Sequence, residues 1–517
     1  MAFHDHRPNR RLGRSERPLI KLTSDLTSFL HKAQRSLAHD TLHLSSQQRS
    51  LLAHILVEFA EDLYQDIGIW KSLEAYNLDF FGTPLPCVLQ PDETMDSEPI
   101  NPARIQFLLW TLYTELEPEL TFSPNHQDLQ RLAVWIADFL SERFTRLPFE
   151  SGVKTFLATP NQYGWEVKRK LIWLGHSYLF RLNCENYVRA HGGKADVPTI
   201  DDFLCQETTS WSGLGVNDIL ASTLDITDEQ RRDLRSWYER HTGYFRVLSV
   251  HEPLMDVQNL LNERSYTIRA EHLDDTFHVD QLVFGSLVPW DNEWYWSGMQ
   301  YTYDDVSDEA IQQVKQDFSQ RSPQIAYRYC DDLAETARDM TRKDYEEFVS
   351  YFGDDLATFP DGYTMAAAMK KLYEQRFESA PKEAVDAFVK KHNLSKPAPT
   401  MSYPPELLES DNGIGLYFYP GEGIEIMNRF DDVINGLKKK GRDLTEEEWE
   451  SIKGVMRSEA ICPQFMMKLI QEYGDESVAS TFFIRNTSNR VYLEYLFRRY
   501  KGHFYRNRYP SLSIVGN

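Results

Sequence analysis

The chain has 517 residues and a formal net charge of −22 at pH 7, with 41% hydrophobic and 13% aromatic residues. Its length is typical of about two to four domains, and its share of aromatic residues excludes disorder on a large scale. The negative charge disfavours binding of nucleic acid or anionic membranes over the whole surface, and no apolar run approaches the roughly 18 residues of a membrane span.

Residues 1–18 are basic and lack the apolar segment of a signal peptide, so we expect a disordered tail. A helical pattern begins at Leu19 and amphipathic segments continue to 243, and a capping-box pair, Ser45 and Gln48, precedes the segment that starts near Leu51. Because each such helix has one apolar stripe to bury, this region predicts a helical domain. The five cysteines show no C-x-x-C spacing, and we expect reduced thiols in a cytoplasmic protein.

The pattern changes at Tyr244. Residues 244–303 contain about five short segments rich in β-branched and aromatic residues, separated by turn residues, which predict a small β-barrel or curled sheet. Helical periodicity returns over 304–394, and the proline-rich stretch 395–406 predicts a linker. Residues 407–517 combine two short strands around a Pro-Gly-Glu-Gly turn with further helices. The whole chain therefore predicts an α+β, mainly helical protein with a small C-terminal α+β domain.

One resemblance to known proteins lies in the predicted β module. It rests on Tyr244, Val247, Leu260, Tyr266, Leu282, Gly285, Pro289, Ser297 and Gly298. Through these positions, residues 244–298 resemble a small β module of uncharacterised bacterial proteins, some of which carry a SEC-C zinc motif. The present chain has no SEC-C cysteine cluster, so zinc binding does not carry over, and the module implies no activity.

Common catalytic motifs are absent from the sequence. There is neither the G-x-S-x-G of a hydrolase nucleophile nor the G-x-x-x-x-G-K-[ST] of a phosphate-binding loop. The stretch SWSGLG at 210–215 lacks the first glycine of the former motif, and it predicts a loop or the start of a helix.

The densest group of potential metal ligands is EHLDDTFHVD, which contains His272, Asp274, His278 and Asp280. A metal ion needs several converging lone pairs, and a turn between strands could bring these side chains together. A solvated acidic loop explains the same residues, and we expect neither a metal nor another cofactor.

Aromatic residues gather near the end of the β module, where Trp290, Trp294 and Trp296 are candidate interaction residues. Period-two alternation places Trp294 and Trp296 on one face of a strand and Tyr295 on the other. One face would then be buried, and the other would contact a neighbouring domain or a ligand.

Near the C-terminus, the cations Arg498, Arg499 and Lys501 alternate with aromatic residues. Cations for phosphates and rings for bases are what single-stranded nucleic acid requires. Helical spacing equally fits a helix with a buried aromatic face, and we favour docking of this segment on its own protein.

Together these patterns favour a non-enzymatic, cytoplasmic interaction or regulatory protein that binds another protein. Two alternatives remain open at this point. One is a metal-dependent hydrolase that uses the His272–Asp280 cluster, and the other is a nucleic-acid-binding protein that uses the basic, aromatic C-terminus.

Overall fold

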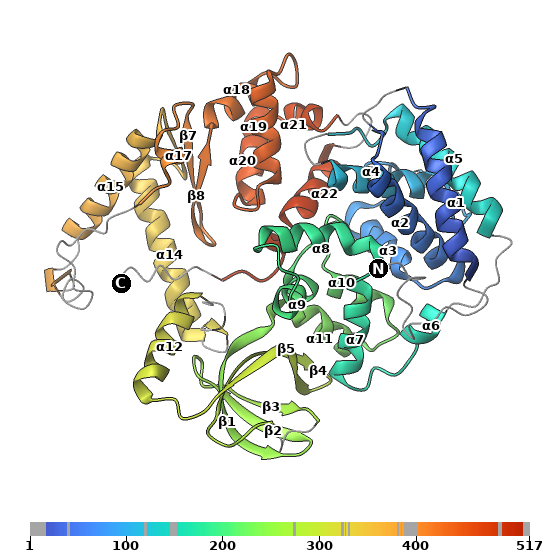
Figure 1. Cartoon of the computed structure of the whole chain (residues 1–517). Helices are drawn as coiled ribbons and strands as arrows, with labels where there is room; N and C mark the ends of the chain where they lie inside the picture. Colours follow the sequence, from blue (N-terminus) through green and yellow to red (C-terminus); the bar gives the residue numbers. More distant parts are fainter. Residues whose placement is uncertain are drawn as a thin grey trace. The chain divides into compact units, whose positions relative to one another are not determined.

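Amphipathic helices make up most of the chain (Figure 1). The computed structural model describes residues 17–38, 42–91, 93–117, 121–144, 152–271, 276–321, 325, 327–328, 331–379, 382–383, 385–386, 402–483 and 489–509. Most of the predicted tail and residues 395–401 of the predicted linker lie outside these ranges. The chain divides into two units, residues 1–306 with 482–505, and residues 307–481 with 506–517. None of the described helices combines the length and the apolar character needed to cross a membrane.

The first unit begins with helices that pack through their apolar faces. They are α1 (Arg17–Gln34), α2 (Ser46–Gln65), α3 (Ile69–Phe81), α4 (Pro102–Leu116), α5 (Gln127–Phe144), α6 (Gly152–Leu157), α7 (Gly164–Gly175), α8 (Tyr178–Ala190), α9 (Val197–Gln206), α10 (Val216–Thr223) and α11 (Asp228–Ser236). Ser45 and Gln48 form the predicted capping box of α2. The start of α3 depends on a tertiary contact instead, because the buried Asp62 carboxylate accepts hydrogen bonds from the backbone N–H groups of residues 68–70.

A closed barrel of five strands follows the helices. Its strands are β1 (His241–His251), β2 (Leu254–Asn259), β3 (Ser265–Arg269), β4 (Leu282–Trp290) and β5 (Glu293–Tyr303). Their order is β1-β2-β3-β5-β4, with β3 and β5 parallel and the other neighbours antiparallel. This is the strand order of the OB-fold, a five-stranded Greek-key barrel. The prediction of a mainly helical α+β protein with a small barrel is therefore confirmed.

Side chains at alternate positions of the strands point inward and fill the barrel. The interior holds Phe245, Val247, Met255, Val257, Tyr266, Ile268, Phe277, Val283 and Leu287. Trp294 and Trp296 pack against this core from the inner face of β5, while Tyr295 points outward and packs edge-on against Trp165 of α7, with ring centroids 5.4 Å apart. Both faces of β5 are thus aromatic, as its period-two pattern predicted, and one of them contacts the helical array.

The second unit contains a three-stranded antiparallel sheet with the strand order β6-β7-β8. Its elements are α12 (Asp308–Arg321), α14 (Asp331–Phe352), β6 (Leu356–Phe359), α15 (Gly362–Ser379), α17 (Pro405–Leu408), β7 (Ile414–Tyr419), β8 (Gly423–Asn428), α18 (Phe430–Lys438), α19 (Glu446–Arg457), α20 (Pro463–Tyr473) and α21 (Glu476–Thr481). The two strands predicted around the Pro-Gly-Glu-Gly turn are β7 and β8. The sequence did not indicate β6, because a strand of four residues is too short to show alternation.

The chain returns to the first unit through α22 (Asn489–Lys501) and a short 3-10 turn (Gly502–Tyr505). Tyr495 of α22 is fully buried, and its ring lies 5.6 Å from Phe81, 6.1 Å from Phe107 and 5.7 Å from Trp110, measured between centroids. Figure 1 shows this red helix beside the blue and cyan helices α3 and α4. A segment near the end of the sequence therefore completes the core of the N-terminal helices.

The loop that contains SWSGLG is shaped by this docking. Gly213 has a φ of +73°, and a Cβ at this position would collide with the backbone carbonyl of Arg498. Trp211 in the same loop packs against Trp70, with ring centroids 5.9 Å apart. The glycine therefore allows backbone-to-backbone approach of α22, and the predicted loop has a packing role.

We predict that Tyr495→Ala destabilises the protein by about 3–5 kcal/mol, because it leaves a cavity among three aromatic rings. Chemical denaturation followed by circular dichroism measures the loss. Arg490→Ala, on an exposed position of the same helix, serves as the control and should change the free energy of unfolding by no more than about 0.5 kcal/mol. A loss below about 1 kcal/mol for Tyr495→Ala would show that α22 does not complete this core.

Candidate functional site

The outer surface of the barrel has two halves with different environments. Toward one end, the outward side chains of β4 and β5 are covered by helices. Trp290 is fully buried and donates a hydrogen bond from its indole N–H to the carbonyl oxygen of Asn161, at 2.9 Å. A Cβ on Gly164 would lie 2.6 Å from the Tyr295 ring, so α7 approaches β5 closely at this point. Trp290, Trp294 and Trp296 are all engaged within the protein.

A buried ionic cluster fastens this covered half to the helices. Asp201 of α9 forms ion pairs with Lys168 of α7 and with Arg240, which immediately precedes β1. Ser297 of β5 donates to the second carboxylate oxygen of Asp201 at 2.8 Å. Burial raises the pKa of Asp201, but the two cations outweigh it and hold the pKa below its usual value. The cluster thereby ties two helices to two strands.

The same cluster contains a serine next to a lysine, an arrangement found in some hydrolases. The Lys168 amine lies 2.9 Å from the Ser297 hydroxyl and 3.2 Å from the Cys205 thiol. Burial lowers the pKa of Lys168, but Cys205 and Asp201 raise it above its ordinary value, so the amine is protonated and is no base. Ser297 is 1% exposed, which leaves no room for a substrate. The cluster therefore has a structural role.

Beyond the helices, the same outer face of the barrel continues into solvent. Here Tyr244, Phe284 and Tyr301 are cross-strand partners on β1, β4 and β5. The ring centroids of Tyr244 and Phe284 are 4.9 Å apart, and those of Phe284 and Tyr301 are 6.3 Å apart. Two further side chains on β5, Met299 and Tyr303, extend this row. We call these five residues the outer aromatic face.

Three of the five residues of the outer aromatic face are exposed, and Tyr244 and Phe284 are half-buried. Met299, Tyr301 and Tyr303 have exposed fractions of 44%, 43% and 42%. The Tyr301 hydroxyl lies 3.8 Å from the Met299 sulfur, and the Tyr303 ring lies 6.2 Å from that of Tyr244. Adjacent exposed aromatic residues on a regular sheet are typical of an interaction surface.

Acidic residues dominate the charge around this face. Asp304 and Asp305 follow Tyr303 directly, and Asp304 accepts a hydrogen bond from Gln281 at 2.8 Å. Arg246 lies two residues after Tyr244 on β1 and supplies a cation. Residues 241–306 contain eleven acidic and three basic residues. The barrel therefore carries a negative field that attracts cations and repels phosphates.

The opposite side of the barrel lacks the features of a nucleic-acid surface. OB-folds that bind single strands use rings and cations on β2 and β3. The outward residues of these two strands are Leu254, Asp256, Gln258, Ser265, Thr267 and Arg269. None of the six is aromatic, and Asp256 accepts hydrogen bonds from Ser249 and Thr267 at 2.9 and 2.7 Å.

The structure describes the potential metal ligands of the sequence only in part. His272 and Asp274 lie outside the described residues, whereas His278 and Asp280 lie in the segment before β4. Within the described parts of the chain, no three or more His, Cys, Asp or Glu side chains are grouped so that they could hold a metal ion.

The C-terminal cations are occupied by contacts within the first unit. Arg499 has a side chain that is 1% exposed, and it donates to the carbonyl oxygen of Thr111 at 3.3 Å. Arg498 stacks 4.1 Å from the Phe80 ring centroid and donates to the Tyr76 hydroxyl at 3.0 Å. Lys501 is fully buried. These three residues could contact a nucleic acid only if α22 were displaced.

The candidate interaction residues of the β module from the sequence were Trp290, Trp294 and Trp296, and the five residues of the outer aromatic face were not among them. The signal was the apolar character of the alternating positions 299, 301 and 303 at the end of β5. The register between β1, β4 and β5, which joins these positions into one row, is a tertiary property.

We predict that Asp201→Asn destabilises the protein by about 3–5 kcal/mol at pH 7, because it leaves the buried Lys168 without a carboxylate and leaves Arg240 with Asp202 alone. The pKa of Asp201 is lower in the folded state than the ordinary 3.8. Its contribution is therefore present above about pH 4 and is lost as the pH falls further, so the gap between wild type and variant should narrow near pH 3.

Denaturant unfolding at pH 7 and pH 3 measures this gap. Asp225→Asn, at an exposed carboxylate, is the control and should alter stability little at either pH. A gap for Asp201→Asn that is equally large at both pH values would contradict the assignment of the ion pairs.

Comparison with known proteins adds one match. Residues 44–206 are similar to a family described as a protein of unknown function, DUF3843. The match spans α2 to α9, includes Lys168 and Asp201, and ends before the barrel. No curated protein and no solved structure matches the chain. The similarity therefore covers part of the helical array on which the barrel rests, and it assigns no activity.

Proposed function

We propose that this protein is a non-enzymatic, cytoplasmic interaction protein, and that its outer aromatic face binds a basic segment of a partner protein. The observation that supports this proposal best is the exposure of Met299, Tyr301 and Tyr303 beside the half-buried rings of Tyr244 and Phe284. Tyrosine is enriched among the residues that dominate protein–protein binding energy, since it combines a large apolar ring with a hydroxyl group.

The position of the row on the barrel favours a macromolecular partner. The outer side of β5 already serves as an interface through Tyr295 and Ser297, which pack against α7 and α9. Tyr301 continues that surface on the same side of β5, because Ser297 and Tyr301 pair with Ser286 and Phe284, two residues apart on β4, across an irregularity at residues 298–300. A partner can therefore add to a surface that is already suited to packing.

Charge favours a basic partner. Eleven acidic residues against three basic ones in 241–306 favour a segment that carries lysine or arginine. Such cations can also stack on tyrosine rings, which adds roughly 0.5–2 kcal/mol per contact. The same acidic field weakens any binding of nucleic acid to this face.

The cysteines support the cytoplasmic part of the proposal. Cys87, Cys184, Cys205 and Cys462 are free thiols. Three of them are buried, and burial raises the pKa of Cys205 to about 11, so this thiol remains protonated at neutral pH. Unpaired thiols are typical of a reducing compartment.

The decisive experiment places the photo-crosslinking residue p-benzoylphenylalanine at position 301 of the full-length protein in its native host. A discrete adduct should form with one polypeptide, which mass spectrometry identifies. The purified partner should then bind the Tyr301→Ser/Tyr303→Ser variant at least tenfold more weakly than wild type, which equals about 1.4 kcal/mol. Added salt should weaken the wild-type complex, because the partner is basic.

Two controls separate binding from folding. The photo-crosslinking residue at position 258, on the polar face of β2, should give no such adduct. Tyr363→Ser alters a more exposed tyrosine outside the barrel (63% exposed) and should leave the affinity unchanged. The proposal fails if position 301 forms adducts only with nucleic acid, if it forms none, or if the double variant binds as tightly as wild type.

A further inference from the structure

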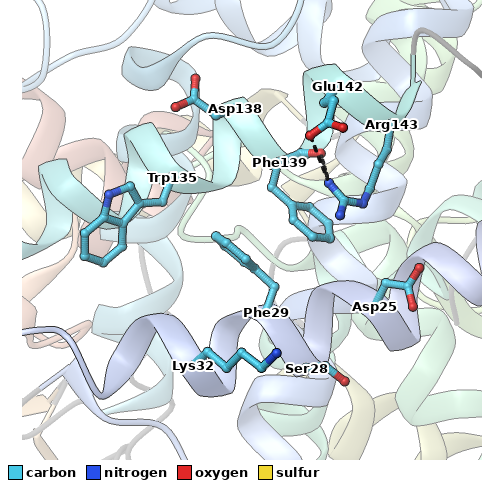
Figure 2. Close-up of a pocket in the computed structure, with 9 residues that line it drawn as sticks. All are labelled: Asp25, Ser28, Phe29, Lys32, Trp135, Asp138, Phe139, Glu142 and Arg143. Atoms are coloured by element: carbon cyan, nitrogen blue, oxygen red, sulfur yellow. Dashed lines mark hydrogen bonds and ion pairs between the residues drawn. The ribbon is translucent and has the colours of Figure 1, made fainter.

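A second surface of the first unit has the features of a docking site and lies on elements other than the barrel. An open groove of about 720 Å³ lies between α1 and α5, and Figure 2 shows the side chains that line it. Its apolar residues are Phe29, Trp135 and Phe139, and its charged residues are Asp25, Lys32, Asp138, Glu142 and Arg143. The rings of Phe29 and Phe139 lie 4.6 Å apart at an angle of 31°.

The groove already holds one guanidinium group against its aromatic floor. The guanidinium carbon of Arg143 lies 3.6 Å from the centre of the Phe139 ring, and the group is 3.6 Å from the Glu142 carboxylate. This pair shows which chemistry suits the groove, namely a planar cation that stacks on a ring and faces a carboxylate.

The rest of the groove repeats these two elements, and Lys32 is the only cation among its lining residues besides Arg143. Trp135 is half-buried, and Asp25 and Asp138 are exposed. In Figure 2, Asp138 lies beside Trp135, and Asp25 lies on α1 at the other side of Phe29. Because Glu142 offsets Arg143, these two carboxylates outnumber Lys32, and the open part of the groove is acidic.

We propose that this groove is the docking site of the chain's own N-terminal segment, residues 1–16. This segment contains four arginines, Arg7, Arg10, Arg11 and Arg14, against Asp5 and Glu16. It also carries Phe3 and Leu12, which can cover an apolar floor. Its chemistry therefore matches both parts of the groove, the rings and the carboxylates.

Geometry permits the contact. The segment leads directly into α1, which begins at Arg17 and forms one wall of the groove. Asp25 lies eight residues further along this helix, a distance of about 12 Å. Seven extended residues between Arg10 and Arg17 reach up to about 23 Å. The segment can thus turn back along α1 and place Arg10 and Arg11 beside Asp25 and Phe29.

Docking within one chain also has a low entropic cost. A short connection keeps the segment at a high effective concentration near the groove, so that modest contacts suffice. The segment would connect α1 to α5 and would exclude other basic peptides from the groove until it is displaced. This inference is independent of the function proposed for the barrel.

The test places p-benzoylphenylalanine at position 12 of the full-length protein and maps the cross-links after irradiation. The expected product is an intramolecular cross-link to residues 132–143 of α5 or to residues 25–32 of α1. Asp25→Asn/Asp138→Asn should reduce its yield at least threefold. Asp225→Asn/Glu229→Gln removes the same charge at exposed positions elsewhere and should leave the yield unchanged.

Trypsin provides an independent measurement, because Arg10, Arg11 and Arg14 are followed by residues that permit cleavage. Cleavage at these sites should be at least threefold faster in Asp25→Asn/Asp138→Asn than in wild type or in the control variant. Cross-links that map outside α1 and α5, an adduct of two chains, or equal cleavage rates in all three proteins would overturn the proposal.

Discussion

The arrangement of the first unit depends on a buried carboxylate, Asp201, which two cations and a hydroxyl surround. An unpaired charge in this position would cost several kcal/mol, so α7, α9, the residue before β1 and β5 must all be in place together. Of these elements, β5 carries most of the proposed site. Once Ser297 is fixed against α9, alternation places Tyr295 against the helices, and the pairing of Tyr301 and Tyr303 with β4 places them beyond the helices.

Burial of charge also explains why the basic C-terminal segment packs within the protein. Arg499 donates to helix α4, and Arg498 stacks on Phe80 of α3, so the cations of α22 stabilise the N-terminal helices. A segment rich in arginine and tyrosine can form a nucleic-acid-binding surface, or it can pack against another part of its own protein. Solvent exposure distinguishes these two roles. The side chain of Arg499 is only 1% exposed, which indicates packing within the protein.

The two proposed docking surfaces have the same kind of chemistry. In each, aromatic rings lie among carboxylates, on a protein with 78 acidic and 56 basic residues. Rings provide apolar area at little cost in side-chain entropy, and carboxylates select cationic partners over phosphates. Surfaces of this kind attract positively charged groups and repel phosphates. The groove between α1 and α5 and the outer face of the barrel would therefore both select basic polypeptide segments.

Local sequence patterns were sufficient to predict the class of fold, many of the helices and the barrel. The capping box at Ser45, the alternation of β5 and the turn before Gly423 are all properties of neighbouring residues, and each was readable in the sequence. Tertiary structure alone decided the candidate site. Tyr244, Phe284 and Tyr301 are distant in sequence, and only the register of β1, β4 and β5 places them in one row. The sequence shows where the tryptophans are, but only the packing determines whether their rings are exposed to solvent. For this reason the tryptophans were the candidates from the sequence, and the exposed tyrosines were not.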